Sequence, residues 1–206
     1  MKVLLVNGSS HEKGCTYTAL CEVAKALNEN GVETEIFQLG KAQVSGCKGC
    51  WACKKIKKCV VDDAVNEFVA KAAEFDGFVF GSPVYYASAS GALVSLMDRA
   101  FYSGGRSFAF KPAAAVVSCR RAGASTTFDV INKYFTMNNM PIVSSNYWNE
   151  IHGNTAEEAL QDTEGLQTMR ILGNNMAWLL KCMQAGKEAG IAPITEKKIF
   201  TNFIRG

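Results

Sequence analysis

Short runs of apolar residues alternate along the chain with longer segments in which apolar residues recur every three or four positions. The short runs are typical of buried strands, and the longer spacing places apolar side chains on one face of a helix. The runs predict five strands, over residues 3–6, 34–39, 78–81, 114–119 and 142–147. The helical spacing predicts five helices, over residues 16–30, 62–73, 92–102, 126–137 and 165–184.

Each predicted strand is followed by a predicted helix, which is the pattern of repeated βαβ units in a parallel sheet. We therefore expect an α/β fold of the flavodoxin-like type, a doubly wound sheet of five parallel strands in the order 2-1-3-4-5 with helices on both faces. The 206 residues suffice for one domain. We expect this domain over residues 1–190, with a cysteine-bearing insert at 40–61 and a C-terminal tail at 191–206.

Charge and hydrophobicity exclude several classes of function. The net charge of +3 is small and evenly spread, so nothing indicates a nucleic-acid or membrane partner. No segment approaches the roughly 18 apolar residues of a membrane span, and the first apolar run is shorter than the roughly 7–15 residues of a signal peptide. We expect a cytoplasmic protein whose eight cysteines are thiols or metal ligands rather than disulfides.

The first predicted strand leads into a polar loop, residues 7–16, which is rich in glycine and hydroxyl side chains and precedes a helix. Backbone N–H groups, the helix dipole and the hydroxyls of such a loop favour a bound phosphate. The loop lacks the glycine pattern of a Rossmann dinucleotide site and the Gly-Lys-Ser/Thr of a P-loop. The alternative is an ordinary polar loop in which Thr16 caps the helix.

The third predicted strand leads into a second loop, residues 81–91, which contains a proline followed by two aromatic residues, Tyr85 and Tyr86. In doubly wound sheets, ligands bind beyond the carboxyl ends of the strands where the strand order reverses, so the two loops flank one crevice. A phosphate loop beside a rigid aromatic loop favours flavin mononucleotide (FMN), with Tyr85 or Tyr86 against its ring. The alternative is that both tyrosines lie at a dimer contact.

Five short segments carry a resemblance that covers nearly the whole chain. They are Asn7-Gly8-Ser9, Gly14-x-Thr16, Gly81-Ser82-Pro83-Val84-Tyr85, Leu96-Met97-Asp98-Arg99 and Met169-Arg170-x-Leu172-Gly173-x-x-Met176-Ala177. In these segments the chain resembles the NADPH-dependent FMN reductase family, and within that family it is most similar to the iron–sulfur flavoproteins.

The resemblance implies which residues bind the flavin. Around the FMN phosphate it implies Ser9, His11, Cys15 and Thr16. On the flavin it implies Pro83, Val84, Tyr85 and Tyr86, and at the far side of the flavin Ser118, Cys119 and Gly123. Two positions depart from the family pattern, because His11 stands where Arg is frequent and Cys15 where Asn or Ser is usual. Both departures weaken the expected hold on the phosphate without abolishing it.

The insert carries four cysteines within thirteen residues, at Cys47, Cys50, Cys53 and Cys59. Closely spaced thiolates of this kind wrap a [4Fe–4S] cluster, whereas a zinc site usually has two Cys-x₂-Cys units separated by a longer span. The spacing also resembles the compact motif of iron–sulfur flavoproteins. We expect a [4Fe–4S] cluster, with plain thiols, a redox disulfide or zinc as the alternatives.

The resemblance implies an enzyme in which FMN carries the chemistry and no catalytic side chain is needed. Electrons would pass from NAD(P)H to a small acceptor, such as a quinone, an azo or nitro compound, or a free flavin. The alternative, which the cysteines favour, is an iron–sulfur flavoprotein that exchanges single electrons with a ferredoxin-like partner. A homodimer or homotetramer is expected by resemblance. Arg99 is expected to hold a carboxylate of the fold.

Overall fold

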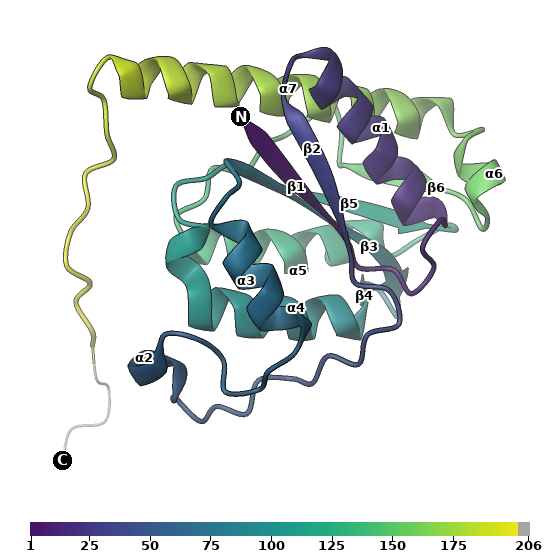
Figure 1. The fold of residues 1–206 in the computed structure, drawn as a ribbon. Helices are drawn as coiled ribbons and strands as arrows, with labels where there is room; N and C mark the ends of the chain where they lie inside the picture. Colours follow the sequence, from purple (N-terminus) through teal and green to yellow (C-terminus); the bar gives the residue numbers. More distant parts are fainter. Residues whose placement is uncertain (202–206) are drawn as a thin grey trace.

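The structure, a computed structural model, describes residues 1–201 and has a parallel sheet with helices on both faces (Figure 1). The parallel strands are β1 (Lys2–Asn7), β2 (Glu33–Gln38), β3 (Gly77–Tyr85), β5 (Ala113–Cys119) and β6 (Glu150–His152). Their order is β2-β1-β3-β5-β6, and the two-residue strand β4 (Ser88–Ala89) pairs antiparallel with the end of β3. The five parallel strands therefore have the predicted order, and the flavodoxin-like fold is confirmed.

All five predicted helices are present, with their ends displaced by a few residues. They are α1 (Cys15–Glu29), α3 (Ala64–Ala72), α4 (Gly91–Gly104), α5 (Ala124–Met137) and α7 (Thr163–Glu188). Two single-turn helices, α2 (Cys53–Ile56) and α6 (Ala156–Ala159), and a 3-10 turn at Gly105–Ser107 were not predicted. Such short turns lack the repeated apolar spacing on which a sequence prediction depends.

The strand β1 shows why the sheet is covered on both faces. Side chains alternate along a strand, so Val3 and Leu5 pack toward the layer of α1 and α7. Leu4 and Val6 pack toward the opposite layer of α3, α4 and α5. Figure 1 shows these two helix layers on either side of the sheet. Because the five strands pair in parallel, their carboxyl ends share one edge of the sheet.

The fifth strand lies later in the chain than the sequence predicts. Within 142–147, Ile142 forms only an isolated bridge with Ala113, and the strand proper is β6. The chain leaves the sheet between them because Ser145 makes a local turn, in which its hydroxyl proton is shared between the carbonyl of Tyr147 and Asn149 Oδ1, each 2.7 Å from Ser145 Oγ. The prediction of a strand at 142–147 is therefore wrong, and turn-forming polar residues are the reason.

The insert and the tail lie outside the sheet. Residues 40–61 run from β2 past the outer side of α4 and contain only the short helix α2 (Figure 1). After α7, residues 191–201 form neither helix nor strand and run from the end of α7 past the opposite helix layer (Figure 1). Across residues 1–201, no helix combines the length and apolar character that a bilayer span requires.

Candidate functional site

The loop after β1 takes its shape from a buried amide side chain. Asn7 is fully buried, and its Oδ1 accepts the backbone N–H of Ser9 at 3.1 Å. Its Nδ2 donates to Gln38 Oε1 at 2.7 Å and to the carbonyl of Glu12 at 3.3 Å. Gln38 in turn donates to the carbonyl of Ser9 at 3.2 Å. Both ends of the loop are thereby tied to β1 and β2.

The loop after β1 is joined by short hydrogen bonds to β3 and to Ser90, which follows β3 and β4. Gly8 N–H donates to the carbonyl of Gly81 at 2.9 Å, and the Ser90 hydroxyl donates to the carbonyl of Gly8 at 2.7 Å. The backbone N–H of Ser90 donates to Ser82 Oγ at 2.9 Å. A Cβ at Gly8 would lie 2.8 Å from the Gly81 oxygen and 2.9 Å from Leu93 Cβ. This close approach requires glycine at position 8.

Beyond the carboxyl ends of β1, β3 and β5 lies a pocket of about 570 Å³. This volume is within the roughly 300–1,000 Å³ of small-molecule and cofactor sites. Nine of the eleven residues that sequence analysis assigned to the cofactor line it. The nine are Ser9, His11, Cys15, Thr16, Pro83, Val84, Tyr85, Ser118 and Cys119. The pocket therefore lies at the predicted crevice.

The other two assigned residues, Tyr86 and Gly123, do not line the pocket. Tyr86 has a positive φ of 50°, and its side chain is fully exposed. Gly123 precedes α5 with a φ of 88°, and a Cβ there would lie 3.0 Å from Val84 Cγ1 and 3.0 Å from Ala87 Cα. Gly123 thus supports the wall of the pocket from outside. Of the two tyrosines, only Tyr85 lines the pocket, so we expect the flavin contact from Tyr85. A contact of Gly123 with a flavin remains a prediction.

The structure adds pocket residues that sequence analysis did not assign to the flavin. They are Glu12, Lys13, Gly14, Arg120, Gly153, Asn154 and Thr155. The Cys15 thiol reaches residues 153–155, where its single proton is shared between the carbonyl oxygen of Thr155 at 3.1 Å and that of Gly153 at 3.4 Å. Burial raises the pKa of Cys15, so the group stays a neutral thiol. Residues 153–155 follow β6. Sequence analysis did not assign them to the site because it placed the fifth strand at 142–147 instead of at β6.

The floor of the pocket has the features of a phosphate site. Thr16 Oγ1 and Ser118 Oγ lie 2.7 Å apart, and both side chains are buried. In such a pair one hydroxyl proton bridges the two oxygens and the other is free for a ligand. The N-cap of α1 is Gly14, and no side chain of residues 1–201 caps that helix end. Its first N–H groups therefore face the pocket, and the alternative in which Thr16 caps the helix is wrong.

The four cysteines of the insert line one small cavity beside α4. It measures about 30 Å³, and its walls include Cys47, Cys50, Cys53, Cys59, Trp51, Tyr102 and Arg99. Trp51 contacts Tyr102 edge-to-face with 6.0 Å between the ring centroids, and Lys54 Nζ lies 3.7 Å above the Trp51 ring. Nowhere in residues 1–201 do three His, Cys, Asp or Glu side chains converge closely enough to hold a metal ion. The thiols share a cavity without having the geometry of a metal site.

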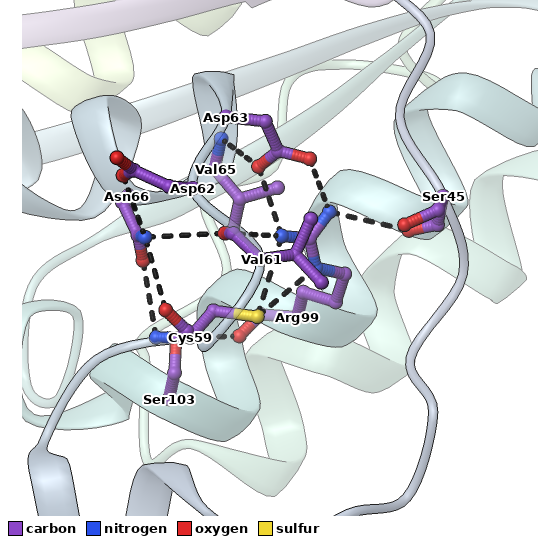
Figure 2. Close-up of polar contacts among 9 residues, drawn as sticks. All are labelled: Ser45, Cys59, Val61, Asp62, Asp63, Val65, Asn66, Arg99 and Ser103. Atoms are coloured by element: carbon purple, nitrogen blue, oxygen red, sulfur yellow. Dashed lines mark hydrogen bonds and ion pairs between the residues drawn. The ribbon is translucent and has the colours of Figure 1, made fainter.

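A buried arginine on α4 reaches the last of these cysteines (Figure 2). Arg99 Nε and Nη2 each lie 3.3 Å from Cys59 Sγ. The same guanidinium donates two hydrogen bonds to the Asp63 carboxylate, from Nη1 to Oδ2 at 2.6 Å and from Nη2 to Oδ1 at 2.8 Å. It also donates to the carbonyl of Val61 at 3.0 Å and to that of Ser45 at 3.3 Å. The prediction that Arg99 holds a carboxylate of the fold is confirmed.

The ion pair shifts the pKa of both partners. The hydrogen bonds from Arg99 lower the pKa of Asp63, and those to Asp63 raise the pKa of Arg99. The Arg99 side chain is 1% exposed, and a buried charge of this kind requires partners for its N–H groups. All three guanidinium nitrogens have such partners, and those partners lie in the insert and at the start of α3.

The fold and the pocket define the class, a flavodoxin-like α/β protein with its ligand site where the strand order reverses. Residues 1–155 match the NADPH-dependent FMN reductase family. An iron–sulfur flavoprotein of Methanocaldococcus jannaschii is 33% identical over 195 residues, which cover 89% of this chain and 100% of the relative. An iron–sulfur flavoprotein of Methanosarcina thermophila is 30% identical over 196 residues, which cover 91% of this chain and 100% of that relative.

A solved structure agrees on the fold. RosB with bound 8-demethyl-8-formylriboflavin-5'-phosphate superposes with a TM-score of 0.70 at 14% identity, covering 100% of this chain and 94% of RosB. The chain belongs to the NADPH-dependent FMN reductase family, a family of oxidoreductases, and its curated relatives are iron–sulfur flavoproteins. The family resemblance read from the sequence is thereby confirmed.

Proposed function

We propose that the protein is an FMN-dependent oxidoreductase that passes electrons from NAD(P)H to a small acceptor, such as a quinone, an azo or nitro compound, or a free flavin. The observation that carries the proposal is the pocket of about 570 Å³ at the carboxyl edge of the sheet. Its hydroxyl pair, uncapped helix end and aromatic wall fit the phosphate and the ring of a flavin mononucleotide.

Each wall of the pocket has a separate part in this proposal. The hydroxyls of Ser9 and Thr16 and the first N–H groups of α1 bind the phosphate. Ser118, which the resemblance placed at the far side of the flavin, is assigned to the phosphate as well, because its hydroxyl pairs with that of Thr16 at 2.7 Å. Lys13 and His11 on the same loop add positive charge when protonated. Burial keeps Cys15 a neutral thiol, so it adds no negative charge beside that phosphate.

The aromatic wall orients the flavin and the substrate. When bound, FMN supplies hydride and electron transfer, and the protein supplies orientation and electrostatics. Tyr85 and Pro83 form a wall against which the ring packs, and Tyr85 remains 47% exposed, so one side of the pocket is open to a substrate. Arg120 at the pocket lining supplies a cation for the phosphates of a nicotinamide cofactor.

Flavin titration followed by anaerobic reduction tests this function. The protein should bind one FMN per chain, and FAD more weakly, because one helix terminus opens onto the pocket. NADPH or NADH should then bleach the flavin absorbance without oxygen, and a quinone should restore it. Equal affinity for FAD, or no flavin binding, would remove the basis of the proposal. Binding without reduction by either nucleotide would leave a flavoprotein with a different electron donor.

A second function is favoured by the insert. In it, the protein is an iron–sulfur flavoprotein that exchanges single electrons with a ferredoxin-like partner. The supporting observation is that four thiols from one short segment line a single cavity. Thiolates are the ligands of iron–sulfur clusters, so Cys47, Cys50, Cys53 and Cys59 have the donor chemistry that a [4Fe–4S] group needs, and binding would draw the four thiols closer together than they lie in this structure. Such a group supplies one-electron transfer when present.

Anaerobic reconstitution with iron and sulfide tests the second function. The wild-type protein should take up about four iron atoms per chain, and serine at any of the four positions should lower that number. Cys182→Ser is the matched control, because Cys182 is an exposed thiol on α7, outside the cavity. Flavin binding should survive every one of these changes, since the two cavities share no lining residue. Iron uptake equal to that of the quadruple serine variant would exclude the cluster.

Two further properties belong to the proposal. The assembly is a homodimer or homotetramer, as the family resemblance implies, and sedimentation measures it directly. The compartment is the cytoplasm, where thiols stay reduced. The support for this compartment is that all eight cysteines are free.

A further inference from the structure

We infer that Arg99 is a positioning residue of the proposed iron–sulfur site: its guanidinium holds the sulfur of Cys59 in place and sets the electron affinity of the group bound there. This inference rests on the second proposed function. The geometry that carries it is the pair of contacts, each 3.3 Å, from Arg99 Nε and Nη2 to Cys59 Sγ (Figure 2).

Burial makes these contacts specific. The Arg99 side chain is 1% exposed, so water does not compete for its N–H groups. Guanidinium has five N–H donors in a fixed planar fork, accepts no hydrogen bond and keeps its charge at all ordinary pH values. The Asp63 carboxylate holds one side of this fork, which directs the Nε and Nη2 donors at the sulfur. Charged donors of this kind favour an anionic acceptor, which a cluster-ligating thiolate is.

Cys59 is also fixed through its backbone. Its N–H donates to Asn66 Oδ1 at 3.0 Å, and its carbonyl accepts from Asn66 Nδ2 at 3.0 Å. Asn66 also donates to the carbonyl of Val61 at 3.2 Å, closing the turn before α3. By contrast, Cys47 and Cys50 are exposed, and within residues 1–201 neither thiol has a hydrogen bond from a buried cation. The position of Cys59 is therefore determined by both its side chain and its backbone before any iron binds.

The contact has an electronic consequence. Hydrogen bonds to ligand sulfurs and nearby positive charge stabilise the more electron-rich state of an iron–sulfur cluster. Removing the Arg99 fork should therefore shift the reduction potential of the cluster to more negative values. A purely structural role, in which Arg99 only ties the insert to Asp63, predicts no such shift in a folded variant that still binds iron.

Arg99→Lys is the test variant because it keeps a positive charge for Asp63 and removes the planar fork. The exposed Arg106, in the turn after α4, provides the matched control, Arg106→Lys. Each protein is reconstituted anaerobically, and its midpoint potential and iron content are measured by a redox titration followed by electron paramagnetic resonance. We expect a more negative midpoint in Arg99→Lys, with bound iron and FMN binding retained, and wild-type values in Arg106→Lys.

The outcomes separate this inference from the function on which it rests. If the wild-type protein takes up no iron, the proposed cluster fails and the inference fails with it. If the wild type binds iron and folded Arg99→Lys has the same potential and iron content, the inference alone fails.

A measurement on the wild-type chain covers the case in which Arg99→Lys does not fold. The protein is labelled with ¹⁵N in the arginine guanidinium groups, and pulsed electron paramagnetic resonance is recorded on the reduced cluster. A ¹⁵N coupling is expected, because Arg99 is the arginine that contacts a cysteine sulfur among residues 1–201. Absence of that coupling would overturn the inference.

Discussion

Thr16 and Ser118 are 102 residues apart in the chain, and their hydroxyl oxygens lie 2.7 Å apart. Thr16 belongs to the first turn of α1 and Ser118 to the end of β5, so this hydrogen bond joins two walls of the pocket. Since only one of the two protons is needed between the oxygens, the other is available to an anionic ligand.

Thr16→Val should therefore weaken FMN binding while leaving the shape of the site nearly unchanged. A hydrogen bond to a charged group contributes about 1.5–3 kcal/mol, so the dissociation constant for FMN should rise about 10- to 150-fold. Isothermal titration calorimetry measures this change. Thr16→Ser is the matched control because it keeps the hydroxyl. Equal affinity of the Val variant and the wild type would mean that this hydroxyl does not contact the phosphate.

Gly8→Ala should disrupt the junction between the loop after β1 and the strand β3. A Cβ would lie 2.8 Å from the Gly81 oxygen, and relief of such overlap costs about 1–3 kcal/mol of folding free energy. Gly91→Ala is the control, because an added Cβ there meets no atom within 4 Å and alanine favours the helix by up to about 1 kcal/mol. Urea denaturation of both variants measures the difference. Equal stability would show that the junction relaxes freely.

Tyr85→Ala and Tyr86→Ala should behave differently, although the two residues are adjacent. Tyr85 lines the pocket, whereas Tyr86 is fully exposed outside it. Truncation of Tyr85 should shift the absorbance spectrum or reduction potential of bound FMN, and Tyr86→Ala should leave both unchanged. A spectral shift in the Tyr86 variant alone would mean that the loop rearranges when the flavin binds.

The free energy of unfolding should fall at acid pH as the Asp63 carboxylate becomes protonated. Hydrogen bonds from Arg99 lower the pKa of this carboxyl below its ordinary value of 3.8, so at acid pH the unfolded chain binds a proton that the folded chain does not. The contribution to the free energy of unfolding is therefore complete above about pH 5, and it declines as pH falls through 3.8 toward the lowered value.

Asp63→Asn tests this dependence. The free energy of unfolding of the variant should be about 3–5 kcal/mol lower than that of the wild type at neutral pH, because the substitution leaves the buried Arg99 without its anionic partner. It should also show a shallower decline of stability between pH 5 and pH 2 than the wild type. Denaturation curves recorded at several pH values measure both effects. An equally steep decline in the variant would assign the acid sensitivity to other carboxyls.

Much of the pocket could be predicted because it follows from local pattern and sheet topology. The apolar runs at 3–6, 78–81 and 114–119 identify three strands whose carboxyl ends share an edge. The segments that follow the strands at 3–6 and 78–81 meet there whatever the side-chain details, which is why both loops were assigned to one crevice. The individual residues Ser9 and Ser118 came from the family resemblance. Sequence analysis missed residues 153–155 because it placed the fifth strand at 142–147, whereas the turn at Ser145 moves that strand to β6. The spacing of apolar residues does not show where such a polar turn interrupts a strand.

The sequence by itself determined the fold class, the crevice between two βα loops and the set of four cysteines, because each depends on residue spacing along the chain. Only the tertiary structure decided which groups complete those sites. Arg99 lies 40 residues from Cys59 in the chain, yet its fork contacts the sulfur (Figure 2), because the insert packs against α4. The physical reason is burial. A guanidinium that is removed from water needs hydrogen-bond acceptors, and these come from residues that are distant in sequence, so the spacing of nearby residues does not identify them.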